Sequence, residues 1–218
     1  MTVFITGGTG YVGRPLIDAL LARSHAVHAL ARSASAGKLP SDARVAIGDA
    51  LDAETFVAAI PPGATFVHLI GTPHPNPSKA EEFRRVDLAS IHAAVAAAQQ
   101  AGVQHFVYVS VAHPAPVMQA YIAVRQEGEA LIRASGIHAT ILRPWYILGP
   151  GHRWPYALLP VYAVLRSIPE TRAGAERLGL VTRGAMVAAL VRAIEEPPTE
   201  RVRILGVPDI RRLSGELG

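Results

Sequence analysis

The stretch TGGTGYVG occupies residues 6–13 and directly follows the short apolar run at residues 3–5. In this spacing Gly7 permits a tight turn, Gly10 lets the backbone approach a pyrophosphate, and Gly13 lets a helix pack on the preceding strand. A helix that begins after such a turn points its free N–H groups at the phosphates. Because the glycines follow a strand pattern and precede a helix pattern, the stretch predicts a dinucleotide-binding turn.

Short apolar runs and helical patterns alternate along the rest of the chain. Runs rich in Val and Ile that are joined by helices predict an α/β fold of the Rossmann type, a doubly wound parallel sheet covered on both faces. We expect strands at Val3–Thr6, Val27–Ala31, Val45–Ile47, Thr65–Ile70, His105–Ser110, Ala139–Leu142 and Val202–Leu205. We expect helices at Tyr11–Arg23, Ala80–Ala101, Val117–Ser135 and Arg183–Glu195, and a short helix capped by Asp52.

The alternation breaks after Pro144, where Trp145, Tyr146, Trp154, Tyr156 and Tyr162 lie in a stretch rich in Pro and Gly. We therefore predict one domain over residues 1–218, with a core at about 1–144 and a small C-terminal cap at about 145–200 on the substrate side. The aromatic residues of this stretch form either a wall of a substrate pocket or the packed interior of the cap.

The composition excludes several classes of protein. With 50% hydrophobic and 17% charged residues, extended disorder is not expected. The absence of cysteine excludes disulfides, thiolate metal sites and cysteine nucleophiles. No stretch approaches the roughly 20 apolar residues of a membrane-spanning helix. These features predict a cytoplasmic protein without a membrane partner.

The charge pattern bears on partners. The net charge is +4, but the basic residues are scattered rather than clustered, so we expect no nucleic-acid partner. The nine histidines show no spacing typical of metal ligands, so we expect no metal. The expected partner is a small-molecule substrate that the sequence does not identify, and an oligomer is compatible with the sequence.

The end of the second expected strand bears on the choice of cofactor. Arg32 lies 22 positions after Gly10, where NAD-selective sites usually carry an acidic residue for the ribose 2′-hydroxyl. No acidic residue occurs between Asp18 and Asp42, and arginine suits a 2′-phosphate. The pair Arg32 and Ser33 therefore predicts NADP(H) as the preferred cofactor. Binding of NAD(H) is also compatible with the sequence. The alternative is that Arg32 is an ordinary surface residue.

Residues 49–51, Asp-Ala-Leu, follow the third expected strand. The Asp49 carboxylate can accept a hydrogen bond from an adenine amino group. Leu51 can cover the adenine ring, and Ala50 lies between these two residues. The alternative is that Asp49 only caps a helix.

Three residues form a candidate reaction centre. Ser110 ends the fifth expected strand, at the edge of the sheet where α/β proteins bind ligands. Tyr121 and Arg125 are four residues apart on an expected helix and so share one face. A cation beside a phenol makes tyrosine a better proton donor and acceptor. The alternative is a core-facing tyrosine beside a solvated arginine.

With these motifs the chain resembles the atypical short-chain dehydrogenase/reductase family, in its NmrA-like, NAD(P)H-binding branch. The resemblance runs from about Thr2 to Leu205. It rests on the turn at 6–13, on Gly48-Asp49, on His68-Leu69-Ile70-Gly71, on Phe106-Val107-Tyr108-Val109-Ser110, and on Leu142-Arg143-Pro144 followed by Gly149-Pro150-Gly151.

The resemblance implies a cofactor site at the carboxyl edge of the sheet. Beyond the residues above, this site would include Thr9, Tyr11, Val12, Leu69, Ile70, Gly71, Arg125 and Pro144. It also implies that Tyr121 is the catalytic tyrosine and Ser110 the assisting serine.

Three positions depart from the family pattern. Arg125 stands where the motif YxxxK has lysine; arginine keeps the cation and can bond the nicotinamide ribose, but its planar fork sits differently. Asp87 lies near the place where extended members carry a helix asparagine, and residues 183–186, Arg-Gly-Ala-Met, stand where related chains often have Asp-Val.

Two functions are compatible with this sequence. The first is an NADP(H)-dependent oxidoreductase acting on a small carbonyl, alcohol or sugar-like substrate. The second is a non-catalytic protein that senses the dinucleotide or binds a partner during assembly, since many members of this branch keep the cofactor site without turnover.

Overall fold

The structure is a computed structural model that describes residues 1–151, 165 and 167–215. Its centre is a parallel sheet in the order β3-β2-β1-β4-β5-β6-β9, which confirms the predicted Rossmann-type doubly wound fold. The strands are β1 (Thr2–Thr6), β2 (Ala26–Ala31), β3 (Arg44–Ile47), β4 (Thr65–His68), β5 (His105–Val109), β6 (His138–Leu142) and β9 (Val202–Leu205). The strand order reverses between β1 and β4, which is where α/β sheets of this kind bind ligands.

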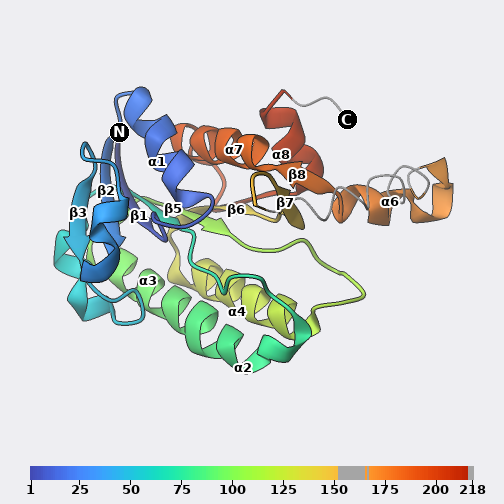
Figure 1. The fold of residues 1–218 in the computed structure, drawn as a ribbon, viewed down its shortest axis with the longest axis horizontal. Coiled ribbons are helices and arrows are strands. Elements are labelled where there is room, and N and C mark those ends of the chain that lie inside the picture. The colour runs from blue at the N-terminus through green and yellow to red at the C-terminus, as the bar shows by residue number, and fades with distance from the viewer. Residues whose placement is uncertain (152–164, 166, 216–218) are drawn as a thin grey trace.

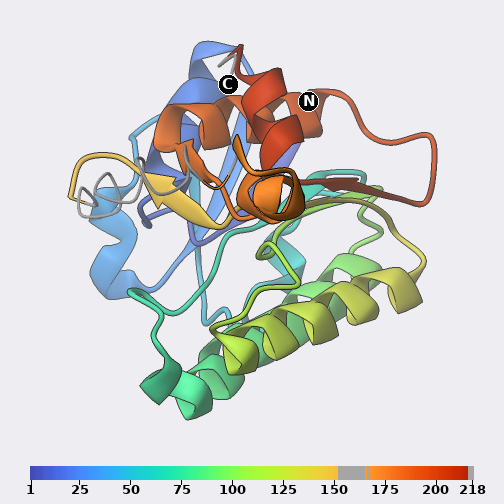
Figure 2. The same ribbon diagram turned by 90° about the vertical axis from the view of Figure 1, so that its right-hand side faces the viewer.

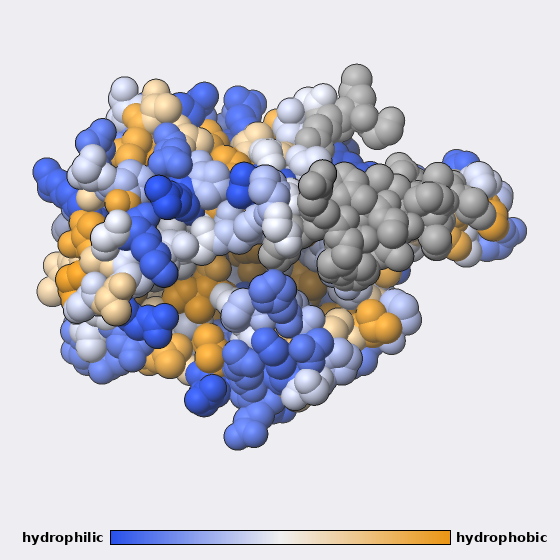
Figure 3. Space-filling view, in the orientation of Figure 1, coloured by the Kyte–Doolittle hydropathy of each residue, from blue (hydrophilic) through white to orange (hydrophobic). Residues whose placement is uncertain are grey.

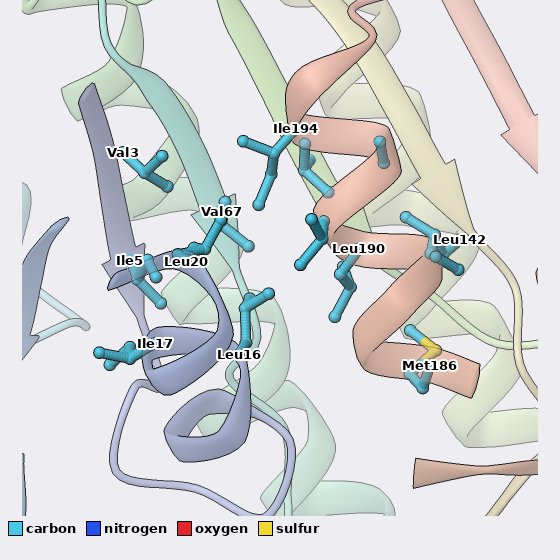
Figure 4. Packing of buried hydrophobic residues seen from close by; sticks show 14 of the residues in the cluster. Val3, Ile5, Leu16, Ile17, Leu20, Val67, Leu142, Met186, Leu190 and Ile194 are labelled. Atoms are coloured by element: carbon cyan, nitrogen blue, oxygen red, sulfur yellow. The ribbon is translucent and has the colours of Figure 1, made fainter. Parts of the chain in front are cut away.

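Helices cover both faces of the sheet, so the molecule has three layers (Figures 1 and 2). One face carries α1 (Gly13–Ala22), α7 (Arg183–Glu195) and α8 (Val207–Leu213). Leu16, Leu20, Leu190 and Ile194 point from α1 and α7 towards the sheet and are fully buried (Figure 4). The predicted cap at about 145–200 included all of α7, but the apolar face of this helix is part of the main core.

The opposite face carries one long helical segment and α4 (Gln119–Ser135) (Figure 1). The segment was predicted as a single helix over Ala80–Ala101, and it consists of α2 (Ala80–Glu82), a π-helical stretch η5 (Phe83–Leu88) and α3 (Ala89–Gln100). Phe66, Phe106, Tyr108 and Ile91 fill the core between this layer and the sheet. The π-helical stretch is a local departure from the α-helix of a kind that often lies at functional sites.

Short helices and a small second sheet complete the described fold. The short 3-10 helices are η1 (Ser33–Lys38), η2 (Ala53–Thr55), η3 (Val57–Ala59) and η4 (Pro77–Lys79). As predicted, Asp52 caps the helix that follows it, because its carboxylate accepts the Glu54 N–H. Beyond the carboxyl end of the main sheet, β7 (Tyr146–Leu148) pairs with β8 (Leu180–Thr182), and α6 (Pro169–Arg177) lies beside them (Figure 1).

Only part of the aromatic stretch that was predicted for the cap lies within the described residues. Trp145 and Tyr146 contact each other edge to face, with ring centroids 5.7 Å apart. Trp154, Tyr156 and Tyr162 lie outside the described residues. In the part of the chain that is described, no helix is long and apolar enough to cross a membrane.

Candidate cofactor and reaction site

The glycine-rich turn joins β1 to α1 at the carboxyl edge of the sheet. Gly7 has a φ of +80°, a left-handed conformation that favours glycine, and its carbonyl accepts the Gly10 N–H at 3.0 Å. A Cβ at Gly13 would collide with the carbonyl oxygen of Gly7. At Gly10 a Cβ would meet only that same oxygen, at 3.1 Å, and the residue is exposed. The turn is therefore closed on its inner side and open on its outer side.

This geometry fits a pyrophosphate. The outer side of the turn leaves room for a group that a larger side chain at Gly10 would displace. The N-terminus of α1 follows directly and supplies the positive end of the helix dipole. Thr9 is half-buried in the turn, and Val12 precedes α1 and packs against the main core. Tyr11 lies below Arg183, whose guanidinium carbon is 5.0 Å from its ring centroid.

Arg32 and Ser33 follow β2 at the same edge of the sheet, and both are exposed. Arg32 has an extended backbone, and among the described residues no carboxylate forms an ion pair with its guanidinium. A cation in this position is available to a phosphate on the adenosine ribose.

Asp49, Ala50 and Leu51 follow β3 at this edge. The Asp49 carboxylate accepts the Leu51 N–H at 3.0 Å, and the Leu51 side chain is 42% exposed. Asp52, and not Asp49, caps η2. The second carboxylate oxygen of Asp49 and the apolar surface of Leu51 are thus positioned at the end of β3, as a contact with adenine would require.

Leu69, Ile70 and Gly71 extend β4 towards the centre of the site. The Leu69 N–H bonds to the carbonyl of Thr6 at 3.0 Å, so this segment runs directly beside the glycine-rich turn. A Cβ at Gly71 would collide with the Arg125 guanidinium. Pro144 is buried after β6, and its carbonyl accepts the Ala112 N–H at 2.9 Å.

Arg125 is buried and forms the hub of a hydrogen-bond network. Its Nη2 donates to Asp87 Oδ1 at 2.6 Å, and the side chains are 4% and 0% exposed. Both terminal nitrogens donate to the carbonyl of Ile70 at 3.2 Å. Nη1 also donates to the Val109 carbonyl at 3.2 Å and to the Tyr108 hydroxyl at 3.3 Å. The guanidinium thereby connects β4, β5, η5 and α4.

Burial and neighbouring groups shift the pKa of Arg125, and the Arg125 charge in turn affects the pKa of His68. Burial alone would lower the Arg125 pKa, but Tyr121, Tyr108 and Asp87 together hold this pKa above its ordinary value. Burial, and then the Arg125 charge, lower the pKa of His68 to about 3. His68 is therefore neutral, and its ring bonds to Thr6 Oγ1 at 2.8 Å and to Ser90 Oγ at 3.3 Å.

Tyr121 lies one turn before Arg125 on α4, as the sequence spacing predicted. The Arg125 guanidinium carbon is 5.0 Å from the centroid of its ring, within cation–π range. The centroid of the Phe83 ring is 5.0 Å from that of Tyr121, and the two rings are tilted by 59°. Tyr121 also packs on the buried residues Val111, Ala115 and Ile122. The Tyr121 ring therefore contacts both a cation and apolar side chains.

Ser110 has a different immediate neighbour. Its hydroxyl donates to Glu129 Oε1 at 2.7 Å, and Glu129 also accepts two bonds from Arg143. Burial raises the Glu129 pKa, but the bonds from Arg143 and Ser110 bring it below its ordinary value. A hydroxyl that donates to Glu129 cannot at the same time donate to a substrate carbonyl. The assisting role of Ser110 stays a prediction, and it requires this hydroxyl to turn.

From the sequence, Asp87 is recognisable only as a departure from a family pattern, and Glu129 is not predicted as a partner of Ser110. For Asp87 one signal is present in the sequence. It lies in the largely apolar helical stretch 86–98, and a carboxylate in such a stretch is seldom buried without a partner. Among the described residues, no group of three or more His, Asp or Glu could hold a metal ion.

Comparisons with known proteins identify the family to which the chain belongs. Residues 7–159 match the model of a family described as NAD(P)H-binding. A 3-diazoavenalumate denitrifying reductase from a Streptomyces species is 30% identical over 229 residues, which cover 91% of this chain and 74% of that protein. A ceramide reductase from Caulobacter vibrioides is 33% identical over 152 residues, which cover 68% of this chain and 47% of that protein.

Solved structures share the fold at low sequence identity. A short-chain dehydrogenase/reductase superfamily protein from Agrobacterium tumefaciens with bound NAD is 19% identical, with a TM-score of 0.68 over 99% of this chain and 83% of that one. A UDP-glucuronic acid 4-epimerase from Bacillus cereus, in complex with NAD, is 18% identical, with a TM-score of 0.68 over 94% and 77%. The chain described here thus belongs to the family described as NAD(P)H-binding.

Proposed function

We propose that this protein is an NADP(H)-dependent oxidoreductase that interconverts a small carbonyl compound and the corresponding alcohol. Sugar-like compounds are included among these substrates. The observation that carries the proposal is the position of Tyr121 against the buried Arg125 cation. Arg125 itself bonds the carbonyls of Ile70 and Val109 at the carboxyl ends of β4 and β5. The names of the relatives support oxidoreductase chemistry, since a 3-diazoavenalumate denitrifying reductase and a ceramide reductase are among them. A further relative is named a ketoreductase.

The chemistry divides between the cofactor and the chain. The bound dinucleotide supplies or accepts the hydride at the carbonyl carbon. In the reductive direction Tyr121 gives its phenolic proton to the carbonyl oxygen, and in the oxidative direction it takes the proton back. The glycine-rich turn holds the pyrophosphate, and Asp49 with Leu51 holds the adenine. Arg32 and Ser33 hold the 2′-phosphate and so favour NADP(H) over NAD(H).

The surroundings of Tyr121 bear on the body of the substrate. Val111, Ala115 and Ile122 are buried beside it, with Trp145 and Leu178 packed around them. Apolar side chains also line the hollow at the centre of the face drawn in Figure 3. This environment favours a carbonyl compound with an apolar body over one that carries charge close to the reacting carbon.

The test begins with binding and continues with turnover. Saturable binding of NADPH is measured first, and the oxidation of NADPH and NADH is then followed with a panel of aliphatic, aromatic and sugar-like ketones and aldehydes. We expect turnover with at least one apolar ketone and a loss of about 10²–10⁴ in kcat for Tyr121→Phe. Saturable binding without turnover on any member would favour the non-catalytic alternative, in which the protein senses the dinucleotide or assists assembly.

A further inference from the structure

The hydrogen bonds of Arg125 leave little of this side chain for a ligand. A guanidinium has five N–H groups, four of them on its two terminal nitrogens. Both terminal nitrogens are engaged, by Asp87, by the carbonyls of Ile70 and Val109, and by the Tyr108 hydroxyl. Only the Nε–H lacks a partner among the described residues. In this arrangement the terminal nitrogens cannot also bond a cofactor ribose.

Asp87 is held as firmly as the arginine it faces. Its Oδ1 accepts from Arg125, while its Oδ2 accepts the Thr72 hydroxyl at 2.6 Å and the Thr72 N–H at 3.0 Å. Its side chain is 0% exposed. Removal of one member of such a pair leaves a buried charge without compensation, which is strongly unfavourable. The carboxylate therefore fixes where the guanidinium stands.

The π-helical stretch η5 holds Tyr121 through two residues. Phe83 contributes a ring that packs on Tyr121, and Asp87 contributes the carboxylate that holds Arg125 over that same ring. Both residues belong to the same stretch, four positions apart. The extra residue of a π-helical turn changes how side chains face a neighbouring helix, and here both face α4.

We propose that Asp87 is a positioning residue: it holds Arg125 against the Tyr121 ring, so that Arg125 supports the catalytic tyrosine and does not anchor the cofactor ribose. Asp87 and Arg125 thus act as one unit across η5 and α4. This inference rests on the proposed oxidoreductase function for its kinetic consequences, but its structural content can be tested without turnover.

The experiment compares the wild type with Asp87→Asn, Arg125→Lys, the double variant Asp87→Asn/Arg125→Lys, and Thr72→Val. Thr72→Val removes one bond to Asp87 without leaving a buried charge, so it serves if Asp87→Asn fails to fold. Glu195→Gln is the control, because it breaks a different ion pair, the one that Arg23 forms with Glu195 at the C-terminal end of α7. Each variant is measured for NADPH affinity, for kcat at saturating NADPH, and for melting temperature.

We expect Asp87→Asn to lower kcat by roughly 10- to 100-fold, because a small misplacement of a reacting group has effects of that size. The Kd for NADPH should stay within about 3-fold, since no bond to the cofactor is lost. Thr72→Val should act in the same direction but more weakly. Arg125→Lys should also lower kcat, because a compact ammonium does not reproduce the planar fork with which Arg125 bonds its partners. In the double variant the two losses should fall short of additive.

A spectroscopic reading tests the same idea independently of activity. The near-ultraviolet circular dichroism band of Tyr121, taken as the wild type minus Tyr121→Phe, reports how firmly that ring is held. We expect this band to shrink in Asp87→Asn and Thr72→Val and to persist in Glu195→Gln. If the wild type turns over no substrate, the proposed function fails, and this band alone decides whether Asp87 positions Tyr121.

Two results would overturn the inference. One is a Kd for NADPH that rises more than about 10-fold in Asp87→Asn with kcat retained, which would make Arg125 a cofactor anchor. The other is a Tyr121 band and a kcat that change no more in Asp87→Asn than in the Glu195→Gln control.

Discussion

At the scale of single residues, Arg32 is the residue that we propose selects NADP(H) over NAD(H). Its guanidinium is exposed at the end of β2, and a charge-assisted bond to a phosphate contributes about 1.5–3 kcal/mol. Arg32→Ala should therefore weaken NADPH binding roughly 10-fold or more and leave NADH binding within about 2-fold. Arg44→Ala is the matched control, because Arg44 is exposed at the opposite end of β3. Equal calorimetric affinities of the wild type for both cofactors would contradict this assignment.

Ser110 poses a second question at this scale. Because its hydroxyl donates to buried Glu129, we expect Ser110→Ala to lower the free energy of unfolding by about 1–3 kcal/mol. With the hydroxyl in this position, kcat/KM on a ketone should change by less than about 3-fold. Urea unfolding and steady-state kinetics provide the two readings. A loss of 10²-fold or more in kcat, as for an acid–base group, would mean that the hydroxyl turns to the substrate during the reaction.

The residue scale is also where the sequence is least informative. Tyr121 and Arg125 were placed on one helical face from their spacing alone, and the structure brings them together. The partner of Arg125 is Asp87, 38 residues earlier in the chain, and only the packing of η5 on α4 brings the two side chains within bonding distance. Likewise, nothing in the local sequence of Ser110 indicates Glu129.

At the scale of elements, the junction of β1 and α1 depends on Gly13. A Cβ there would collide with backbone atoms of Gly7 and Gly8, which cannot move without opening the turn. Gly13→Ala should lower the free energy of unfolding by about 1–3 kcal/mol, the usual range for overpacking, and weaken NADPH binding. Gly37→Ala in η1 is the control, since a Cβ there meets nothing within 4 Å. Equal unfolding midpoints of Gly13→Ala and Gly37→Ala would show that the turn tolerates a side chain.

Elements with strong local signals were predicted well. The strands follow from Val- and Ile-rich runs, and the end of α4 follows from Gly136, which adopts a φ of +77°. The π-helical stretch within residues 80–100 was not predicted, because residues 83–88 continue a helical pattern, and the stretch places Asp87 and Phe83 towards α4. The small sheet of β7 and β8 also lacked a signal, since each strand has three residues.

At the scale of the whole molecule, buried histidines make stability depend on pH. Burial lowers the pKa of His68 to about 3 and that of His105 to about 4. In the unfolded chain both titrate near pH 6.5, so between these values the unfolded state binds more protons than the folded state. Stability is therefore full above about pH 6.5 and decreases as the pH falls, by about 2 kcal/mol per histidine at pH 5.

Urea unfolding at pH 7.5 and pH 5.0 measures this difference. His68→Gln should reduce it by about 2 kcal/mol, because one buried ring no longer titrates. His92→Gln, on the exposed side of α3, is the control. Equal free energies of unfolding of the wild type at both pH values would contradict the description of neutral, buried rings.

The most direct test of the central claim is a fluorescence titration of NADPH into the wild type and into Gly10→Val. A valine at this exposed position meets little within the protein but occupies the place of the pyrophosphate. We predict saturable binding by the wild type and a loss of at least about 100-fold in affinity for Gly10→Val, with an unchanged far-ultraviolet circular dichroism spectrum. Binding of NADPH by a folded Gly10→Val with wild-type affinity would show that the dinucleotide does not lie on this turn.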